Sequence, residues 1–391
     1  MASNALMNNY GTRAITVTKG DGSWLWDDQG NKYLDAISGI AVCGLGHAHP
    51  AVTAALSEQA ATLVHASNLY NLQPQEQLAE KLRTLSGMDN MFFANSGAEA
   101  NEAAIKLARL HGNNKGVPVP TIVVMENAFH GRTMATLTAT GNPKVQQGFT
   151  PCLDGFVRVP FGDADAVEAA VKSNPNIVAV LVEPIQGEGG IHTPSDDYLK
   201  QLRTLCDNHD LLLMLDEIQT GNGRTGKYFA YQHADILPDV LTTAKGLGNG
   251  VPIGVCMASG KASQLMQPGS HGSTFGGNPL ACSVGLAVVD TLQKDNLAER
   301  AAQLGEQLQH QLRERLSHCP HFVEVRGKGL MIGIELAHPC AQLVAAATAK
   351  GLLITVTAER VIRLLPPLNL KDDEASLLVD TLVNLIEEFA P

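Results

Sequence analysis

The sequence lacks any apolar run long enough to cross a bilayer, and it lacks an excess of positive charge. Apolar runs such as 211–215 fall far short of the roughly 20 residues that a transmembrane helix needs. Residues 1–11 hold no basic stretch followed by an apolar one, so no signal peptide is expected. The net charge of −11 argues against a general affinity for nucleic acids or anionic membranes, but a few well-placed arginines still suffice for an anionic small molecule.

Cysteine is sparse, and its spacing shows no pairing pattern. The seven cysteines are odd in number and include no C-x-x-C pair, so we expect no disulfide framework and a reducing, cytoplasmic environment. They stand at positions 43, 152, 206, 256, 282, 319 and 340. His47 and His49 are metal-binding residue types, but no cysteine or acidic cluster stands directly beside them. We therefore expect a structural role for them and no metal ion.

The sequence is rich in apolar residues and in glycines at strand-to-helix junctions. With 391 residues, of which 45% are hydrophobic, the chain is longer than one hydrophobic core usually spans, so two domains are expected. Residues 13–44 predict a small antiparallel meander. Its strands are expected at 14–19, 23–27 and 32–36, separated by turns rich in Gly, Asp and Asn.

From about residue 50 the pattern changes to an alternation of strands and helices. Short apolar runs alternate with helix-like stretches such as 99–110 and 196–208. This alternation predicts an α/β domain with a mostly parallel sheet that helices cover on both faces. The expected strands lie at 91–93, 121–125, 178–182, 211–215 and 240–242.

The C-terminal part of the chain predicts a smaller α+β domain. A long helical pattern follows Leu280, and strand-like pieces at 323–336 and 352–365 flank a further helical segment. A last helix is expected to run to about Phe389.

Polar residues follow each apolar run, which is where open α/β sheets bind their ligands. After the first run, Ser96 and Glu99 have the spacing of a capping box that opens a helix. The small residues Gly97 and Ala98 leave the free N–H groups of the first turn open to an anion. An ordinary helix cap is the alternative interpretation.

Three further strand ends carry residues suited to chemistry. Phe129 and Arg132 follow the second run, where a ring can stack on a flat cofactor and a guanidinium can hold a carboxylate; a core role for Phe129 is the alternative. Asp216 ends an all-apolar run and needs a positive partner, either in a structural salt bridge or as a protonated pyridine nitrogen. Lys245 follows the last run among small residues, where an amine can form a Schiff base; a solvated loop lysine is the alternative.

Together these four features match the contacts that pyridoxal 5'-phosphate requires. The chain also resembles the class III, fold-type-I aminotransferases over nearly its whole length, through the segments NSGAEANE, FHGRT, LVEPIQGEGG, LDEIQTGNGRTG, TTAKGLGNGVPIG and GSTFGGNP. The resemblance implies a large domain of residues 49–285 with a mostly parallel seven-stranded sheet. It also implies a small α+β domain built from residues 1–48 and 286–391.

By matching positions, the resemblance implies cofactor contacts from the backbone of Gly97 and Ala98 and from the side chains of Phe129, Asp216, Gln219, Lys245 and Thr274. Asp216 is expected to pair with the pyridine nitrogen, and Gln219 to contact the ring oxygen. Thr274 is expected to reach the phosphate of the neighbouring subunit, which implies a homodimer with shared active sites. Relatives often have threonine where this chain has Ala98, so one hydroxyl contact to the phosphate is expected to be missing.

The resemblance also implies two arginine sites for two different substrates. Arg132, with Ser273 nearby, is expected to hold the carboxylate at the far end of the substrate. Arg363 is expected to bind the carboxylate next to the reacting carbon of glutamate, although from its own position it equally fits an exposed edge-strand arginine. Glu188 is expected to cover Arg363 when no such carboxylate is bound, with a supporting role for Glu183.

The implied reaction transfers the terminal amine of an acylated ornithine to 2-oxoglutarate, with Lys245 and Asp216 as the catalytic residues. Ile40 stands near the place where ornithine aminotransferases carry a tyrosine that recognises a free α-amine, which favours an acylated substrate. The acetyl and succinyl forms both stay open. The alternatives are another ω-aminotransferase acting on ornithine or γ-aminobutyrate, a racemase or decarboxylase-like relative, a nucleotide-binding protein, and a non-catalytic binding protein of the same fold.

Overall fold

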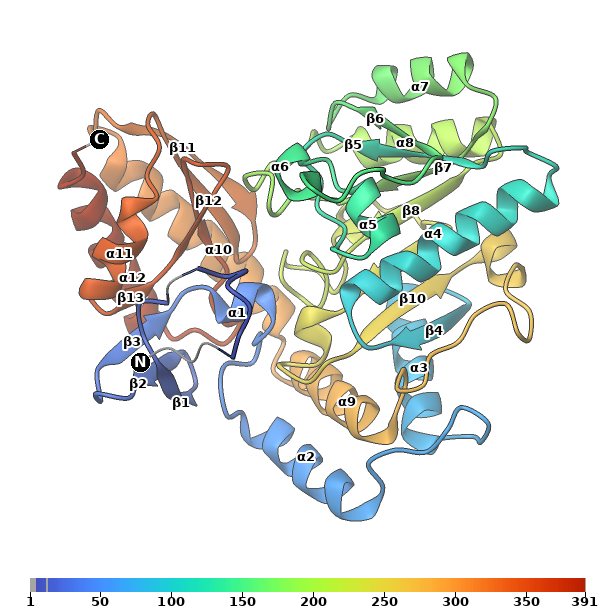
Figure 1. The fold of residues 1–391 in the computed structure, drawn as a ribbon. Coiled ribbons are helices and arrows are strands. Elements are labelled where there is room, and N and C mark those ends of the chain that lie inside the picture. Colours follow the sequence, from blue (N-terminus) through green and yellow to red (C-terminus); the bar gives the residue numbers. More distant parts are fainter. Residues whose placement is uncertain (1–4, 12, 391) are drawn as a thin grey trace.

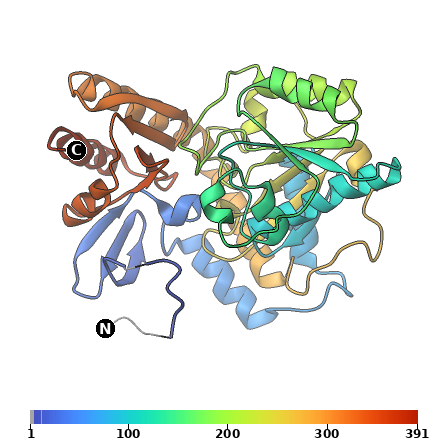
Figure 2. The same ribbon diagram turned by 45° about the horizontal axis from the view of Figure 1, so that its top comes forward.

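The computed structural model describes residues 5–11 and 13–390, which form two lobes that lie side by side (Figures 1 and 2). The large lobe is built around a seven-stranded sheet. The small lobe combines the first strands of the chain with its last quarter, so segments that are far apart in the sequence are neighbours in space (Figure 1).

The sheet of the large lobe has the strand order β4-β10-β9-β8-β7-β5-β6. Only β10 runs antiparallel to its neighbours β4 and β9, so the prediction of a mostly parallel seven-stranded sheet is confirmed. The strands are β4 Asn90–Ala94, β5 Thr121–Met125, β6 Phe156–Val159, β7 Ile177–Val182, β8 Leu212–Asp216, β9 Val240–Thr243 and β10 Gly254–Ala258. The apolar runs marked five of these strands to within one or two residues, but they did not mark β6 or β10.

Helices cover both faces of this sheet and bury a separate apolar cluster on each. The alanines of α4 allow it to pack closely on the central strands (Figure 2), and α4 is longer than the stretch 99–110 that the sequence indicated. The helix expected from residue 196 begins two residues later, at Tyr198. The helices of this lobe are α2 Pro50–Thr62, α3 Gln73–Ser86, α4 Gly97–Asn114, α5 Met134–Ala139, α6 Pro143–Gln146, α7 Ala164–Ser173, α8 Tyr198–Asn208 and α9 Pro279–Lys294, with 3-10 turns η1 Ala230–His233, η2 Lys245–Leu247 and η3 Gly260–Gln264.

The small lobe holds two four-stranded sheets, of order β1-β2-β3-β13 and β11-β12-β15-β14. Their strands are β1 Val17–Asp21, β2 Trp24–Asp27, β3 Lys32–Asp35, β11 Phe322–Lys328, β12 Met331–Leu336, β13 Leu352–Leu353, β14 Thr355–Thr357 and β15 Val361–Leu364, and its helices are α1 Ser38–Ala41, α10 Leu297–Leu316, α11 Gln342–Ala349 and α12 Asp372–Glu387. The expected meander is therefore present, whereas each expected C-terminal strand piece is divided by a turn. The long helical pattern after Leu280 is broken at Asn296, which has a left-handed backbone.

One apolar core joins the two ends of the chain. Leu34 and Leu45 lie in the same buried cluster as the apolar faces of α10 and α12, and β13 pairs in parallel with β3. The numerical division at 48/49 and 285/286 stays a prediction. Among the described residues no helix has the length and apolar character that a membrane crossing requires, and all seven cysteines are free thiols.

The two histidines of the GHAHP segment have structural contacts. His47 Nε2 lies 2.8 Å from the Asp35 carboxylate, and that hydrogen bond, with a further one to Cys43, raises the pKa of His47 to about 9. The His49 side chain accepts a hydrogen bond from the Ala51 N–H at the start of α2. Together the two side chains fasten the segment that connects the N-terminal sheet to α2.

Candidate active site

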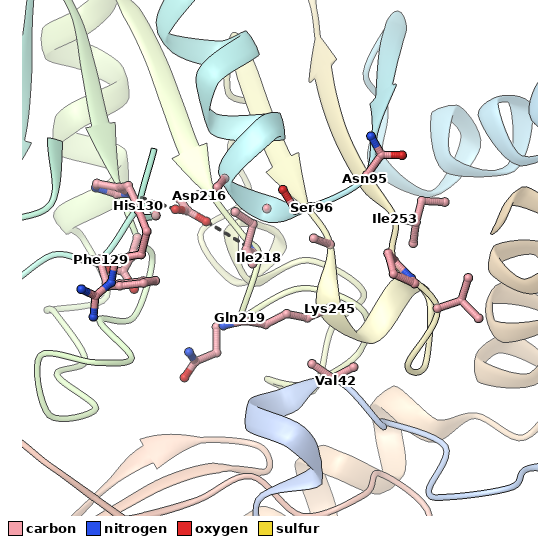
Figure 3. A pocket seen from close by; sticks show the side chains of 18 of the residues that line it. Val42, Asn95, Ser96, Phe129, His130, Asp216, Ile218, Gln219, Lys245 and Ile253 are labelled. Carbon is pink, nitrogen blue, oxygen red and sulfur yellow. Dashed lines mark hydrogen bonds and ion pairs between the residues drawn. The ribbon is translucent and has the colours of Figure 1, made fainter. Parts of the chain in front are cut away.

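A cavity of about 380 Å³ opens at the carboxyl ends of the central strands of the large lobe. It brings together most of the residues singled out from the sequence, and Figure 3 shows Lys245 and Gln219 pointing into it. Val42, just after α1, closes it from the small lobe. The predicted residues that line it are Gly97, Ala98, Phe129, Arg132, Glu183, Asp216, Gln219 and Lys245.

The N-terminus of α4 faces the cavity. Ser96 caps this helix by accepting a hydrogen bond from the Glu99 N–H at 3.2 Å, as expected. The reciprocal half of the capping box is absent, because the Glu99 carboxylate accepts from the Asn95 N–H at 2.7 Å instead. A Cβ atom at Gly97 would lie 2.8 Å from Ile218, so this position must stay small. The first turn therefore presents N–H groups on a surface that an anion can approach.

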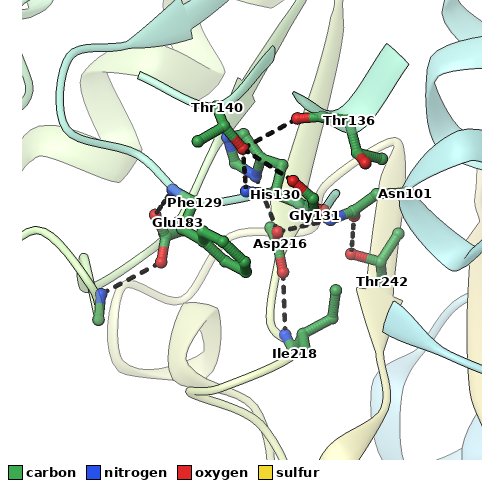
Figure 4. A network of polar contacts seen from close by, with 11 residues as sticks. Asn101, Phe129, His130, Gly131, Thr136, Thr140, Glu183, Asp216, Ile218 and Thr242 are labelled. Carbon is green, nitrogen blue, oxygen red and sulfur yellow. Dashed lines mark hydrogen bonds and ion pairs between the residues drawn. The ribbon is translucent and has the colours of Figure 1, made fainter. Parts of the chain in front are cut away.

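Asp216 is buried and is held by neutral donors and an imidazole, with no lysine or arginine paired to it among the described residues. Its Oδ2 accepts from Asn101 Nδ2 at 2.7 Å and lies 2.8 Å from His130 Nδ1, and its Oδ1 accepts from the Ile218 N–H at 3.1 Å (Figure 4). Thr242 in turn donates to Asn101 Oδ1 at 2.7 Å. These contacts orient the carboxylate at the cavity, where Asp216 is one of the lining residues.

Sequence reasoning missed Asn101 and His130, although both lie in segments that were singled out. Both side chains are buried: Asn101 at 0% exposure on the alanine face of α4, and His130 at 2% exposure in the loop after β5. The signal was available for Asn101, because an amide on an otherwise small, apolar helix face must find a polar partner. For His130 no local pattern exists, since its partner is 86 residues away in the sequence.

Lys245 is half-buried and follows β9 with a left-handed backbone, φ 43°. Burial lowers the pKa of its ammonium group, and the nearby positive charge of Arg363 acts in the same direction. Glu188, Asp216 and Glu183 act to raise that pKa but do not outweigh the burial. The site therefore makes it easier for this group to lose its proton than in water, and the neutral amine is the form that attacks a carbonyl carbon.

The loop after β5 is tied to the segment after β7 by one buried carboxylate. Glu183 accepts from the Phe129 N–H at 2.9 Å and from the Gly187 N–H at 3.1 Å. Its burial raises the pKa of this carboxyl to about 7. Phe129 is half-buried and faces the cavity, outside the core clusters, so the alternative of a core role is wrong. The Arg132 guanidinium is exposed and lies 5.7 Å from the Phe129 ring centre.

Arg363 and Glu188 form an ion pair between the lobes, with 2.5 Å between Arg363 Nη1 and Glu188 Oε1. The Arg363 side chain is 3% exposed and lies on β15, between β12 and β14, so it is not an edge-strand surface arginine. Although burial acts to raise it, the charge of Arg363 holds the pKa of Glu188 below its usual value. The pair keeps both charges neutralised in a partly dry site.

Gln219 has bonding capacity left for a ligand. Its Oε1 atom is buried and has no hydrogen-bond partner among the described residues. A Cβ atom at Gly187 would lie 2.4 Å from this oxygen, so a glycine is needed there for the amide to keep its place.

Four predicted residues do not line the cavity of their own chain: the paired Glu188 and Arg363, and the neighbours Ser273 and Thr274. Ser273 Oγ accepts from Asn95 Nδ2 at 3.2 Å and from the Gly276 N–H at 2.9 Å, and Thr274 is exposed next to it. Within one copy of the chain, residues 273–274 therefore lie outside the lining of its own cavity.

Comparison with known proteins agrees with this geometry. The family model described as Aminotransferase class-III matches residues 6–386. The acetylornithine aminotransferase of Nitrosomonas europaea is 54% identical over 98% of both chains, and acetylornithine aminotransferase 1 of Bordetella bronchiseptica is 51% identical over 99% of this chain and 98% of the relative.

Solved structures match over nearly the whole chain as well. The ornithine aminotransferase of Toxoplasma gondii has a TM-score of 0.94 at 35% identity, covering 97% of this chain and 92% of that one. The acetylornithine aminotransferase of Elizabethkingia anophelis has a TM-score of 0.87 at 36% identity, covering 98% and 96%. A second structure of the Toxoplasma gondii enzyme is described as having partial occupancy of PLP at the active site. The chain belongs to the class-III aminotransferases.

Proposed function

We propose that this aminotransferase converts N2-acetyl-L-ornithine and 2-oxoglutarate into N-acetyl-L-glutamate 5-semialdehyde and L-glutamate, a step of arginine biosynthesis. The relatives at 51–54% identity that are named acetylornithine aminotransferases support the substrate. The observation that carries the proposal is the Arg363–Glu188 ion pair, whose two charges both act on the pKa of Lys245. A site with this pair can accept two kinds of substrate. One is an amine whose reacting carbon carries no carboxylate, and the other is an amino acid whose reacting carbon does carry one.

The cofactor is pyridoxal 5'-phosphate, and the cavity residues fit it. The small first turn of α4 suits the phosphate, the oriented Asp216 carboxylate suits a protonated ring nitrogen, and the unsatisfied Gln219 Oε1 suits a ring hydroxyl that donates to it. Phe129 lies where it can stack on a ring. When bound, the cofactor supplies an aldehyde that joins to amines and a ring that withdraws electrons from the reacting carbon.

Lys245 and Asp216 carry out the proton chemistry in this proposal. The amine of Lys245, with its lowered pKa, takes a proton from the substrate carbon next to the nitrogen and returns one to the cofactor side. Asp216 would keep a proton on the ring nitrogen, because Asn101, His130 and the Ile218 N–H hold its carboxylate in place and no lysine or arginine among the described residues pairs with it.

Arg363 and Glu188 account for the use of two substrates. Acetylornithine reacts at its terminal amine and brings no carboxylate to Arg363, so Glu188 keeps that guanidinium neutralised. Glutamate brings a carboxylate, which takes the place of Glu188 and binds the fork of Arg363. Arg132 is free to hold the carboxylate at the far end in both cases, because its guanidinium lies at the cavity without a carboxylate partner among the described residues.

We also propose that the active unit is a homodimer. Segment 63–70 packs against segment 273–280, with Asn68 Nδ2 donating to the Ser273 carbonyl at 3.1 Å and the rings of His65 and Phe275 5.2 Å apart. This surface leaves large apolar side chains exposed, which a second copy would cover. They are Leu63, Val64, Leu69, Tyr70 and Phe275. In this arrangement Ser273 and Thr274 complete the neighbouring site, where Thr274 contacts the phosphate.

Two further proposals concern the organisation of the protein. The shared core of both chain ends supports a small domain made of residues 1–48 and 286–391. In the sequence these two segments flank a large domain of residues 49–285. The seven free thiols support a cytoplasmic location.

A titration of single half-reactions tests the proposed substrate. The protein loaded with pyridoxal 5'-phosphate is mixed with N-acetylornithine, N-succinylornithine, ornithine or γ-aminobutyrate, and the absorbance of the bound cofactor is followed. We expect acetylornithine to convert the cofactor at least about tenfold more efficiently than ornithine, a difference of about 1.4 kcal/mol. Faster conversion by ornithine or γ-aminobutyrate would replace the proposed substrate but leave the family unchanged.

A further inference from the structure

The loop that carries Glu188 is a closed unit wedged between the two lobes. An antiparallel bridge between Gln186 and His192 closes its base. On the large-lobe side, Gln186 Nε2 donates to the Glu126 carbonyl at 2.7 Å. The base of the loop is therefore fixed, and Glu188 stands near its tip.

The far half of this loop has an unfavourable backbone. Gly190 has φ 116°, and the next residue, Ile191, is a fully buried β-branched residue with φ 54°. Left-handed conformations are costly for β-branched side chains and persist only where the surroundings enforce them. Gly333 on β12 is part of those surroundings, because a Cβ atom there would lie 2.9 Å from the Ile191 side chain.

Arg326 on β11 binds the strained backbone directly. Its Nε donates to the carbonyls of Gly190 and Ile191, both at 3.1 Å, and its Nη2 donates to the Gly190 carbonyl at 2.6 Å. Its Nη1 pairs with Glu324 at 2.6 Å and with Glu335. The side chain is 11% exposed, so this guanidinium is aimed at the loop and held there by two carboxylates.

The near half of the loop is fastened to both lobes. On the small-lobe side the Thr357 hydroxyl on β14 donates to the Glu188 carbonyl, and on the large-lobe side the Gly187 N–H donates to Glu183. Backbone contacts therefore flank the Glu188 side chain on both sides, from β14 and from β11. The one part of Glu188 that is left free to change partner is the side chain beyond its Cα atom.

We infer that Arg326 is a positioning residue that fixes the backbone of loop 186–192, so that Glu188 exchanges between Arg363 and the cavity by side-chain rotation alone. The inference rests on the proposed function for the role of Glu188. A fixed backbone keeps the carboxylate within reach of Arg363 whenever no substrate carboxylate is present. A loosened loop would release Arg363 more often, and an amine without a carboxylate would then meet an uncompensated charge.

The test compares Arg326→Lys and Arg326→Gln with the matched control Arg360→Gln. Lysine keeps a positive charge near Glu324 and Glu335 but cannot reach both loop carbonyls with one fork. Arg360 pairs with the same Glu335 at 2.9 Å, is 54% exposed, and makes no hydrogen bond to loop 186–192 among the described residues. Both half-reactions are measured by single turnover in the cofactor-loaded proteins.

For Arg326→Lys we expect the acetylornithine half-reaction to slow about tenfold, because misplaced groups around a reacting centre commonly cost that much or more. The 2-oxoglutarate half-reaction should change less than about threefold, and Arg360→Gln should change both by less than about twofold. Equal losses in both half-reactions would show a general structural effect and would overturn the inference. Should the Gln variant fail to fold, the Lys variant still decides.

A second measurement needs neither substrate nor cofactor. Hydrogen exchange of the amides in 187–191 should be at least about tenfold faster in cofactor-free Arg326→Lys than in the parent protein, because local opening reports directly on lost backbone contacts. Unchanged hydrogen-exchange rates of these amides would overturn the inference. If the parent protein does not react with acetylornithine, the proposed substrate fails on its own, and the amine that does react replaces it in the comparison of half-reactions.

Discussion

The cofactor-facing side of the cavity and its gate, the Glu188–Arg363 pair, are built in different ways. On the cofactor-facing side, Asp216 ends a strand, and Gly97 and Lys245 come just after two other strands of the same sheet, so the strand ends alone bring them together. The gate joins residues 175 positions apart and from different lobes. The first arrangement is therefore fixed by local strand-to-helix geometry, whereas the second exists only once the lobes have packed together.

Loss of Lys245 should disable both half-reactions, so that the cofactor-facing side and the Glu188–Arg363 pair can no longer be told apart by their effects on rate. For Lys245→Ala we expect single-turnover rates to fall by at least about 10³-fold with either substrate, because a positioned proton-transfer group typically contributes 10² to 10⁴. Rapid-mixing absorbance measures this, with acetylornithine for the first half-reaction and 2-oxoglutarate for the second. A variant that kept a tenth of the parent rate would remove Lys245 from the proposed chemistry.

Asp216→Asn should affect the cofactor-facing side alone and should slow both half-reactions by about 10²–10³-fold, because it removes a preorganised charge and leaves the shape nearly unchanged. The measurement is the single-turnover rate with each substrate. Thr242→Val is the matched control, since it removes only the outer hydroxyl that supports Asn101. A larger loss in the control than in Asp216→Asn would contradict the assigned role.

Glu188→Ala should separate the two half-reactions. We expect the acetylornithine half-reaction to slow by about 10–100-fold, because Arg363 is 3% exposed and is left as an uncompensated buried charge when the amine binds. The 2-oxoglutarate half-reaction should change several-fold less, since its carboxylate takes the vacated place. Single-turnover titration of each substrate gives both rates. Equal losses in the two half-reactions would contradict the exchange of Glu188 for a substrate carboxylate at Arg363.

Much of the cofactor-facing side could be read from the sequence, because strand ends and helix caps leave local signals. Asp216 and Lys245 directly follow apolar runs, and Ser96 caps α4 as its spacing indicated. The class-III family, its mostly parallel sheet and its cofactor are likewise confirmed. The individual roles of the site residues stay predictions.

What the sequence could not indicate was set by contacts between distant segments. The antiparallel β10 looks like any other short apolar run, and only its pairing with β4 and β9 reveals its direction. The ties of Arg326 to loop 186–192 cross more than 130 positions, as do many contacts between the lobes. Thr274 is exposed because of how its segment lies on the folded surface, and no local sequence pattern predicts that.

The smallest effect is expected at His47, whose side chain pairs with Asp35 in the small lobe. The pKa of this imidazole is raised from its ordinary value of 6.5 to about 9 in the folded protein. Its stabilisation is therefore complete below pH 6.5 and is lost as the pH rises through about 9. His47→Gln should lower the free energy of unfolding by about 1–2 kcal/mol at pH 6 and by less at pH 9.5, without changing either half-reaction.

Urea unfolding at the two pH values tests this last expectation, with tryptophan fluorescence as the probe. Both tryptophans of the chain, Trp24 and Trp26, lie on β2, next to the strand that carries Asp35, so the signal reports on the small lobe. A pH-independent difference between the two proteins would mean that the imidazole contributes by its shape and not by its charge.

The parallel pairing of β3 with β13 has a consequence for the newborn chain. The strand β3, which contains Leu34, cannot pair with β13 until Leu352 has been synthesised. More than three hundred residues are therefore translated while the N-terminal sheet still lacks one of its strands. Domains fold as units during synthesis, and closing so long a loop is slow. We therefore expect the large lobe to mature first, and the N-terminal meander to remain open to proteases and chaperones until translation is nearly complete.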